Sequence, residues 1–308
     1  MKRKITILTI AFLSSMLMYA NAFAAATGRC GDSITWTLDD SGNLTLSGSG
    51  EMWNNDYGDS PFKDYEIRKA TVEYGITSIG ESAFLGCRGM TELTLPNSVR
   101  SIGDGAFSGC SGLTELTLPN SVTSIGDCAF YGCTGLTELI LPNSVSSIGD
   151  IAFTYCSGLE KITVESGNSC YDSRDNCNSI IDTEFNTLIV GCKNSVIPNS
   201  VTSIGYYAFY GCSGLTELTL PDSVASIGDG AFICCSDLSK ITSLAEIPPM
   251  CGSGVFDRVN KTNCELIVPE GSVAAYKQAE VWNEFSNISG FSGVEVTVAG
   301  KTRKIVVE

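Results

Sequence analysis

The chain has 308 residues, 14 cysteines, no histidine and a formal net charge of −15. Without histidine it can build neither a Ser-His-Asp nor a Cys-His catalytic set, and no histidine-ligated metal site. A chain this acidic is repelled by nucleic acid and by anionic lipid, which excludes both as partners.

Residues 1–24 have the composition of a secretory signal peptide. Basic residues 2–4 precede an apolar run over residues 5–19, and Ala22-Phe23-Ala24 follows as a small-x-small cleavage site. The run is too short to span a bilayer comfortably. Its removal takes away three of the 19 basic and none of the 34 acidic residues, so the mature charge is −18. We therefore expect a secreted or cell-surface chain with no integral membrane segment after cleavage.

Residues 25–75 are expected to form an N-terminal β cap. The segment GRCGDSITWTLDDSGNLTLSGSGEMW contains two alternating runs on either side of Asp40-Ser41-Gly42-Asn43. Turn residues between two alternating runs predict a β-hairpin.

Residues 76–245 repeat one pattern. Its Ala-Phe pair recurs about every 23 residues, with one wider interval, and a Ser-Ile-Gly triplet keeps the same spacing. A fixed period in this range with a Leu-x-x-Leu-x-Leu core is typical of leucine-rich repeats. No single coil can bury its own apolar side, so coils must stack into one continuous interior. The repeated phenylalanines are Phe84, Phe107, Phe130, Phe153, Phe209 and Phe232.

One unit, LTELTLPNSVTSIGDCAFYGC, predicts the path of a coil. The Leu-x-Leu portion predicts a strand that ends at Pro119, and Val122 with Ile125 predicts a second short extended segment. Gly126 predicts a bend, and the remainder is too short for more than one helical or 3₁₀ turn. The repeated aspartate, Asp127 in this unit, is expected to cap that turn.

The wide interval between Phe153 and Phe209 predicts an insertion in the array. Within it, β-rich runs at residues 179–181 and 187–190 flank a polar pentapeptide, which predicts an inserted hairpin at about residues 165–195. Residues 246–290 are expected to form a C-terminal cap, with Ser272 capping a short helix. Residues 291–308 alternate like a β-hairpin around Ala299-Gly300.

The repeat resembles the BspA-like (Treponema pallidum type) leucine-rich repeats of bacterial surface and secreted proteins. The pattern LTxLxLPxSVxSIGxxAFxGCxGL carries the resemblance. It implies a mainly β repeat solenoid of 23-residue coils with short helical or 3₁₀ turns, an inserted hairpin and β and α end caps. Some members of that family bind host matrix or plasma proteins and promote adhesion, and the family has no catalytic residues to carry over.

Two sets of outward residues are candidate partner-binding positions. A row of glutamates at one strand position predicts an acidic stripe for a basic partner, with a solvated face kept for solubility as the alternative. Tyrosines at variable positions of the turn side predict an aromatic contact patch, with partial burial at coil corners as the alternative. The residues are Glu92, Glu115, Glu138 and Glu217, and Tyr131, Tyr155, Tyr206, Tyr207 and Tyr210.

The cysteines divide into a repeated set and a scattered set. Cys87, Cys110, Cys133, Cys156, Cys212 and Cys235 share one repeat position, which predicts a buried column of reduced thiols, with bridging of neighbouring coils as the alternative. Cys170 with Cys177 and Cys251 with Cys264 are candidate disulfides, because each pair closes a short loop. We expect no metal and no cofactor.

These observations predict a secreted or cell-surface leucine-rich repeat protein that binds another protein. The expected partner is a host extracellular matrix or plasma protein. A structural, envelope-associated repeat module without a soluble ligand is the alternative. We expect no enzyme, because no reactive constellation of side chains is visible in the sequence.

Overall fold

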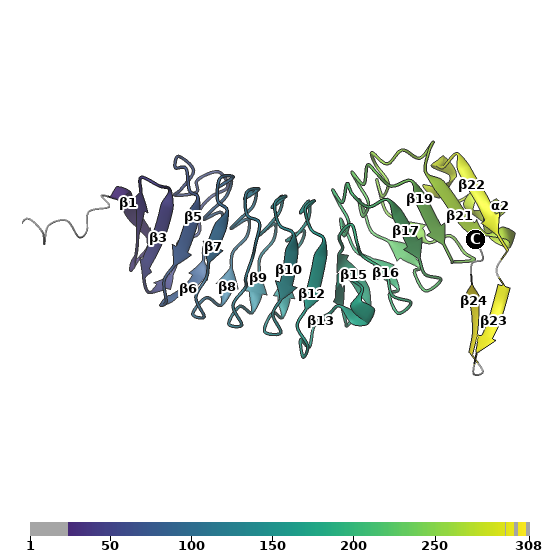
Figure 1. Cartoon of the computed structure of the whole chain (residues 1–308), viewed down its shortest axis with the longest axis horizontal. Coiled ribbons are helices and arrows are strands. Elements are labelled where there is room, and N and C mark those ends of the chain that lie inside the picture. The colour runs from purple at the N-terminus through teal and green to yellow at the C-terminus, as the bar shows by residue number, and fades with distance from the viewer. Residues whose placement is uncertain (1–23, 293, 299–300, 306–308) are drawn as a thin grey trace, which may run out of the picture.

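The protein is an elongated β solenoid in a computed structural model that describes residues 24–292, 294–298 and 301–305. Each coil stacks on the one before it, and the chain runs from one end of the solenoid to the other (Figure 1). Of the predicted signal peptide only Ala24 lies within the described residues, as the first residue of β1 (Ala24–Gly31). Within the described ranges, no helix is long and apolar enough to cross a membrane.

The Leu-x-Leu segments form the longer strands, which lie side by side in parallel register. Glu138 lies opposite Lys161, for example, and Leu139 opposite Ile162. In the unit LTELTLPNSVTSIGDCAFYGC, the strand is reduced to a single β-bridge from Thr117 to Ile140. The strands of this side are β5 (Lys69–Val72), β7 (Glu92–Thr94), β10 (Glu138–Leu141), β12 (Lys161–Val164), β17 (Glu217–Leu220), β19 (Lys240–Ser243), β21 (Glu265–Pro269) and β22 (Asn287–Phe291).

The Ser-Ile pairs form a second set of short parallel strands, as predicted. Ser101 lies opposite Ser124, and Ile102 opposite Ile125. The isoleucines point into the core, and Ile125 is 1% exposed. The strands of this side are β4 (Gly50–Glu51), β6 (Ile76–Ile79), β8 (Ser101–Ile102), β9 (Ser124–Ile125), β11 (Ser147–Ile148), β16 (Ser203–Ile204), β18 (Ser226–Ile227) and β20 (Met250–Cys251).

The third side of each coil consists of hydrogen-bonded turns. Ala129 N donates to Gly126 O at 3.3 Å, which is the three-residue bond of a 3₁₀ turn. Phe130 N instead donates to Ala152 O of the next coil at 2.8 Å. Alternation between local bonds and bonds to the next coil satisfies the backbone without a regular helix, and it holds neighbouring coils in register.

The phenylalanines of the turns stack into a column, as the repeat predicted. Ring centroids of Phe107 and Phe130 lie 5.2 Å apart, and Phe130 and Phe153 lie 5.2 Å apart with ring planes at 2°. The column also contains Phe62 and Phe256, which the repeat pattern did not identify. Burial of each ring contributes roughly 1.5–3 kcal/mol of transfer free energy, so stacking is the main source of the fold's stability.

The inserted hairpin interrupts this column. Strands β13 (Tyr171–Asp172), β14 (Ile180–Asp182) and β15 (Thr187–Val190) are antiparallel, which confirms the hairpin, and a 3₁₀ helix η1 (Arg174–Asn176) lies between β13 and β14. Phe153 belongs to one apolar cluster and Phe209 to another. The two arrays of coils meet at an angle beside β13 and β15 (Figure 1).

The N-terminal end begins with an antiparallel sheet of β1, β2 (Ile34–Asp39) and β3 (Asn43–Gly48). Gly42 N donates to Asp39 O at 3.1 Å in the turn between β2 and β3, where the sequence predicted a hairpin. β3 then pairs in parallel with β5, so the first coil continues the sheet directly. Trp36 covers the end of the phenylalanine column, with its ring 5.6 Å from Phe62.

At the C-terminal end the helix is shorter than predicted. A 3₁₀ helix η2 (Glu270–Ser272), a single α turn α2 (Val273–Tyr276) and a 3₁₀ helix η3 (Trp282–Glu284) replace it, and the Ser272 side chain makes no cap hydrogen bond. The buried Trp282 ring covers Phe256 at 5.4 Å, and parallel pairing continues to β22. Beyond it, β23 (Val294–Val298) and β24 (Lys301–Ile305) form an antiparallel ribbon, while the predicted turn residues Ala299-Gly300 lie outside the described residues.

All 14 cysteines are free thiols in the structure. Five of the six thiols in the repeated column, all except Cys87, donate to a main-chain carbonyl of the preceding coil, for example Cys133 Sγ to Phe107 O at 3.3 Å. Burial raises the pKa of Cys133 to about 12, so the thiol stays protonated. This column therefore agrees with the prediction of reduced, buried cysteines.

The two candidate disulfides are absent from the structure. Cys170 packs at the edge of the first apolar cluster, whereas Cys177 belongs to the second and points its Sγ at Ser179 O. The Sγ of Cys251 faces Pro249 O, and the Sγ of Cys264 faces Glu265 O. Proximity in sequence does not bring these thiols together, because Cys177, Cys251 and Cys264 each face a separate main-chain carbonyl and Cys170 faces the Ser169 hydroxyl.

Candidate functional site: a tyrosine groove on the turn side

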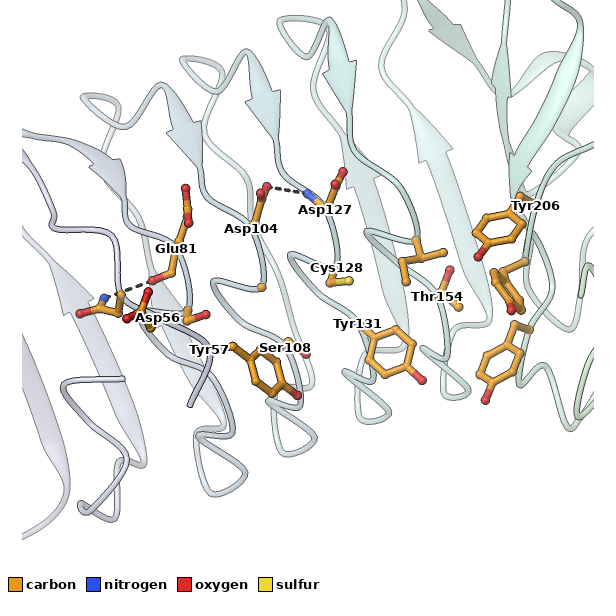
Figure 2. A pocket seen from close by; sticks show the side chains of 16 residues that line it. Asp56, Tyr57, Glu81, Asp104, Ser108, Asp127, Cys128, Tyr131, Thr154 and Tyr206 are labelled. Carbon is orange, nitrogen blue, oxygen red and sulfur yellow. Dashed lines mark hydrogen bonds between the residues drawn. The ribbon is translucent and has the colours of Figure 1, made fainter. Parts of the chain in front are cut away.

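A groove of about 620 Å³ runs across the turns of several successive coils. Its residues come from the loop before the first repeat and from five turns, ending beyond the inserted hairpin. Figure 2 shows the acidic side chains along one edge of the groove and Tyr57, Tyr131 and Tyr206 beside them. The lining residues are Asn55, Asp56, Tyr57, Glu81, Ser82, Asp104, Gly105, Ser108, Asp127, Cys128, Tyr131, Ile151, Thr154, Tyr206, Tyr207 and Tyr210.

The acidic edge is a product of the repeated Ser-Ile-Gly-Asp sequence. Asp104 Oδ1 accepts a hydrogen bond from Asp127 N at 2.8 Å (Figure 2). Asp127 Oδ1 accepts one from Asp150 N at 2.7 Å. The predicted cap within the same turn is therefore wrong, since each carboxylate binds the equivalent amide of the next coil. A Cβ at Gly126 would lie 2.2 Å from Asp104 Oδ1. Glycine is therefore needed here to let the Asp104 carboxylate reach Asp127 N, whereas the sequence suggested that it allows a bend.

Five tyrosines gather at the end of the groove where the solenoid is interrupted. Ring centroids of Tyr131 and Tyr155 lie 6.2 Å apart, and those of Tyr155 and Tyr210 lie 5.4 Å apart. Tyr207 contacts both Tyr206 and Tyr210 edge to face, at 4.0 and 5.4 Å. The structure thus brings all five predicted tyrosines into one cluster, which we call the tyrosine cluster.

The tyrosine cluster is partly open to solvent. The exposed fraction is 39% for Tyr155 and 51% for Tyr206, while Tyr57, across the groove in the N-terminal loop, is 86% exposed. Tyr131 is half-buried. Neither full exposure nor simple corner burial describes these rings, because each one keeps part of its surface free while its neighbours hold it in place.

Tyr155 occupies a backbone position that glycine takes in four other coils. Its φ is 60°, and the equivalent residues with positive φ include Gly109, Gly132 and Gly211. The left-handed conformation costs roughly 1–2 kcal/mol for a residue with a side chain. Cys234 and Arg258 adopt the same left-handed conformation at the equivalent position of later coils, so the solenoid accepts a side chain here more than once.

Two hydroxyl groups of the tyrosine cluster have a raised pKa. Burial raises the pKa of Tyr131 to about 12, and the neighbouring Tyr210 hydroxyl adds to the shift. A hydrogen bond with Tyr207 is the main cause that raises the pKa of Tyr206. Tyr131 and Tyr206 therefore offer neutral rings and hydroxyl hydrogen-bonding groups to a partner.

The carboxylates of the groove lack cationic partners. Among the described residues, none of Asp56, Glu81, Asp104 and Asp127 forms an ion pair, and none of the residues lining the groove is lysine or arginine. A concave surface lined by charges of one sign focuses the electrostatic potential. The groove is therefore a region of negative potential beside exposed aromatic faces.

The predicted glutamate stripe lies elsewhere, on the side of the Leu-x-Leu strands. Lysines interrupt it, since Lys69 pairs with Glu92 at 2.8 Å and Lys161 with Glu138 at 2.6 Å. Glu217 lies opposite Lys240 in the sheet register. Exposed pairs of this kind contribute about 0–1 kcal/mol each, and they reduce the negative potential of that face. Its role in partner binding stays a prediction.

The groove offers binding chemistry rather than a reactive constellation. Within the part of the chain that the structure describes, no three His, Cys, Asp or Glu side chains converge on a metal-ion position. Sequence reasoning missed Asp56 and Tyr57, because they belong to an N-terminal loop outside the repeat pattern. The repeated acidic residue before each turn can be recognised in the sequence. The row of carboxylates along the groove, however, forms only when the coils are stacked.

The comparison with protein families defines the class. The pattern described as BspA type leucine-rich repeat region matches residues 55–181 and 178–271, in six copies. The chain belongs to this family, as its repeat predicted. No curated protein matches the chain significantly.

One solved structure of a leucine-rich repeat protein resembles the chain in fold, and other bacterial structures align with most of its length. A leucine-rich repeat protein from Eubacterium ventriosum is 23% identical with a TM-score of 0.55, covering 86% of this chain and 84% of that one. A leucine-rich cell surface protein from Faecalibacterium prausnitzii is 21% identical with a TM-score of 0.46, covering 89% and 97%. The pneumococcal vaccine antigen PcpA is 15% identical with a TM-score of 0.42, covering 87% and 97%.

Proposed function

We propose that this protein is a secreted or cell-surface repeat scaffold that binds another protein through the tyrosine groove. The observation that carries the proposal is the tyrosine cluster beside carboxylates without cationic partners. Tyrosine is enriched at protein interfaces because one side chain supplies both a large apolar face and a hydrogen-bonding hydroxyl. Family membership and the lack of a reactive constellation support binding rather than catalysis.

The signal-peptide composition of residues 1–24 supports export, with removal of this segment leaving the solenoid outside the cell. A host extracellular matrix or plasma protein is the partner we propose to test first, and adhesion would follow from such binding. The solenoid presents the groove along its length, so a partner can contact several coils at once.

A binding screen tests this function. The mature protein is immobilised and exposed to matrix and plasma proteins at micromolar concentration, alongside a variant with Tyr131, Tyr206 and Tyr210 replaced by serine. We expect a partner to bind the wild-type protein at least tenfold more tightly than the variant. Retention of the protein in the envelope fraction with no binding to any screened protein would instead favour the structural, envelope-associated module.

A further inference from the structure

We propose that the occupant of the tyrosine groove is an extended, arginine-rich segment of the partner protein. This inference rests on the proposed function and names the chemistry of the partner. Three features of the groove carry it: its length, its unpaired carboxylates and its exposed aromatic rings.

The length of the groove fits an extended chain. The lining residues span five steps of the stack, from Tyr57 through the turns at Glu81, Asp104, Asp127 and Ile151 to the turn at Tyr206. Coils that pair as parallel strands are about 4.8 Å apart, so the groove is about 24 Å long. An extended segment rises about 3.3 Å per residue, so about seven residues fill this length.

The charge of the groove selects a cationic segment. Glu81, Asp104 and Asp127 come from consecutive coils and line one edge (Figure 2). Asp104 and Asp127 each use one carboxylate oxygen, Oδ1, to hold the next coil, which leaves Oδ2 for a partner. On the strand side this chain supplies lysines to neighbouring glutamates, and in the groove it supplies none. Complementary charge therefore has to come from the ligand.

The aromatic rings favour arginine over lysine. A guanidinium group stacks on a tyrosine face and can still donate two parallel hydrogen bonds to a carboxylate. In the groove, Tyr57 and Tyr131 lie beside the row of carboxylates (Figure 2). One arginine side chain of the ligand can therefore contact a tyrosine ring and a carboxylate at the same time. Side chains at alternate positions of an extended segment project to one face about 6.6 Å apart, and long arginine side chains can adapt this spacing to that of the coils.

Packing of the Tyr155 ring holds the aromatic end of the groove beside the inserted hairpin. Glycine at this position would relieve the left-handed backbone, yet the chain carries a tyrosine whose ring holds Tyr131 and Tyr210. The ring lies over Gly211, where a Cβ would come within 2.2 Å of Tyr155 Cδ2. The small residue at position 211 thus leaves room for the Tyr155 ring, which keeps this part of the aromatic surface in place.

The test uses the mature full-length protein and a synthetic heptapeptide with arginine at positions 2, 4 and 6 separated by serines. A matched peptide carries citrulline, the neutral isostere of arginine, at the same positions. We expect micromolar binding of the arginine peptide by isothermal calorimetry, at least tenfold weaker binding of the citrulline peptide, and affinity that falls as salt rises.

Paired variants locate the binding. Asp104→Asn with Asp127→Asn retains the amide oxygen that accepts the coil-to-coil hydrogen bond while removing two charges. Glu280→Gln with Asp222→Asn removes two exposed charges outside the groove. The groove variant is expected to bind the arginine peptide at least tenfold more weakly, and the control variant within threefold of wild type, with unchanged circular dichroism for both.

Three outcomes overturn the inference. Equal losses in both variants indicate nonspecific attraction to an acidic protein. Equal binding of the citrulline peptide, or binding of a neutral oligosaccharide that competes with it, indicates an aromatic site for an uncharged ligand. If a natural partner from the screen binds through the tyrosines while the arginine peptide does not bind, the proposed function stands and this inference fails; if neither binds, both fail.

Discussion

The rings of Tyr155 and Tyr210 meet across the inserted hairpin, with centroids 5.4 Å apart, and Tyr155 N donates to Tyr210 O at 3.2 Å. The contact joins the last coil before the insertion to the first regular coil after it. It occurs where the apolar interior divides into two clusters. The tyrosine cluster therefore links the two arrays through Tyr155, while its other four members line the groove.

Packing of the Tyr155 ring over Gly211 predicts a measurable coupling between these positions. Gly211→Ala is expected to lower the free energy of unfolding by about 1–2 kcal/mol because of its left-handed backbone. Overlap of the new Cβ with the Tyr155 ring should lower it by roughly 1–3 kcal/mol more. In a Tyr155→Gly background only the first loss should remain. Urea unfolding monitored by circular dichroism gives the free energy of unfolding of the wild type, the two single variants and the double variant.

Gly132→Ala is the matched control, because Gly132 has a similar φ of 70° and the nearest atom to an added Cβ is 3.9 Å away. It should lose only the backbone contribution, about 1–2 kcal/mol, with or without Tyr155. Equal losses for Gly132→Ala and Gly211→Ala in the wild-type background would contradict the packing described here.

The bond from Asp150 N to Asp127 Oδ1 predicts different effects for two substitutions of Asp127. Asp127→Ala removes the acceptor and should destabilise the protein by about 1 kcal/mol. Asp127→Asn keeps an oxygen acceptor and should remain within about 0.5 kcal/mol of wild type. Thermal unfolding at moderate salt gives both values. If the two variants are equally destabilised, the charge of Asp127 rather than its hydrogen bond to the next coil holds the coils together.

The repeating part of the fold could be predicted because each repeated residue has one role. Phe107 and Phe130 stack, Ile102 and Ile125 pair, and the spacing alone places them above one another. The hairpin was visible as two β-rich runs around polar residues. Regular stacking amplifies weak local preferences, so a pattern seen in six copies is more reliable than any single copy.

Features that depend on contacts between coils were harder to predict. Asp127 looked like a cap because its partner, Asp150 N, is in the next coil and not in its own turn. Ser272 precedes a good helical sequence, but the aromatic packing of Trp282 on Phe256 limits the helix to one turn. The tyrosines were identified from their variability, whereas the N-terminal half of the groove required coordinates, because Tyr57 lies outside the repeat.

Division of the core into two clusters predicts that the two arrays unfold separately. Phe130→Ala removes a ring from the first cluster and Phe232→Ala one from the second, each at a cost of about 3–5 kcal/mol. Repeat arrays transmit such losses mainly to neighbouring coils. Hydrogen exchange followed by mass spectrometry should show faster exchange before the hairpin in the first variant and after residue 201 in the second.

Tyr155→Gly provides a control for this separation, since it weakens the link between the arrays and leaves both phenylalanine columns intact. Combined with either phenylalanine variant, Tyr155→Gly should confine the faster hydrogen exchange more completely to the array that carries the phenylalanine substitution. Uniform acceleration along the whole chain in either phenylalanine variant would show that the arrays unfold as one cooperative unit.

Buried thiols predict that stability falls in alkaline solution. Burial raises the pKa of Cys87, Cys133 and Cys235 from 9.0 to about 12. Below pH 9 these thiols are protonated in both the folded and the unfolded chain, so they do not change stability with pH. Between pH 9 and about 12 only the unfolded chain loses their protons, which lowers the free energy of unfolding by up to about 1.4 kcal/mol per thiol for each pH unit.

Cys133→Ser tests the origin of this loss, because serine can donate to Phe107 O as the thiol does but does not titrate in this range. Its free energy of unfolding should decrease less steeply than that of wild type from pH 9 to pH 11, in urea titrations with a reducing agent present. The partly exposed Cys128, which lines the groove, is the control position, and Cys128→Ser should leave the slope closer to that of wild type. Identical slopes for all three proteins would mean that repulsion among the many carboxylates and phenolates, rather than the buried thiol column, sets the alkaline limit of this solenoid.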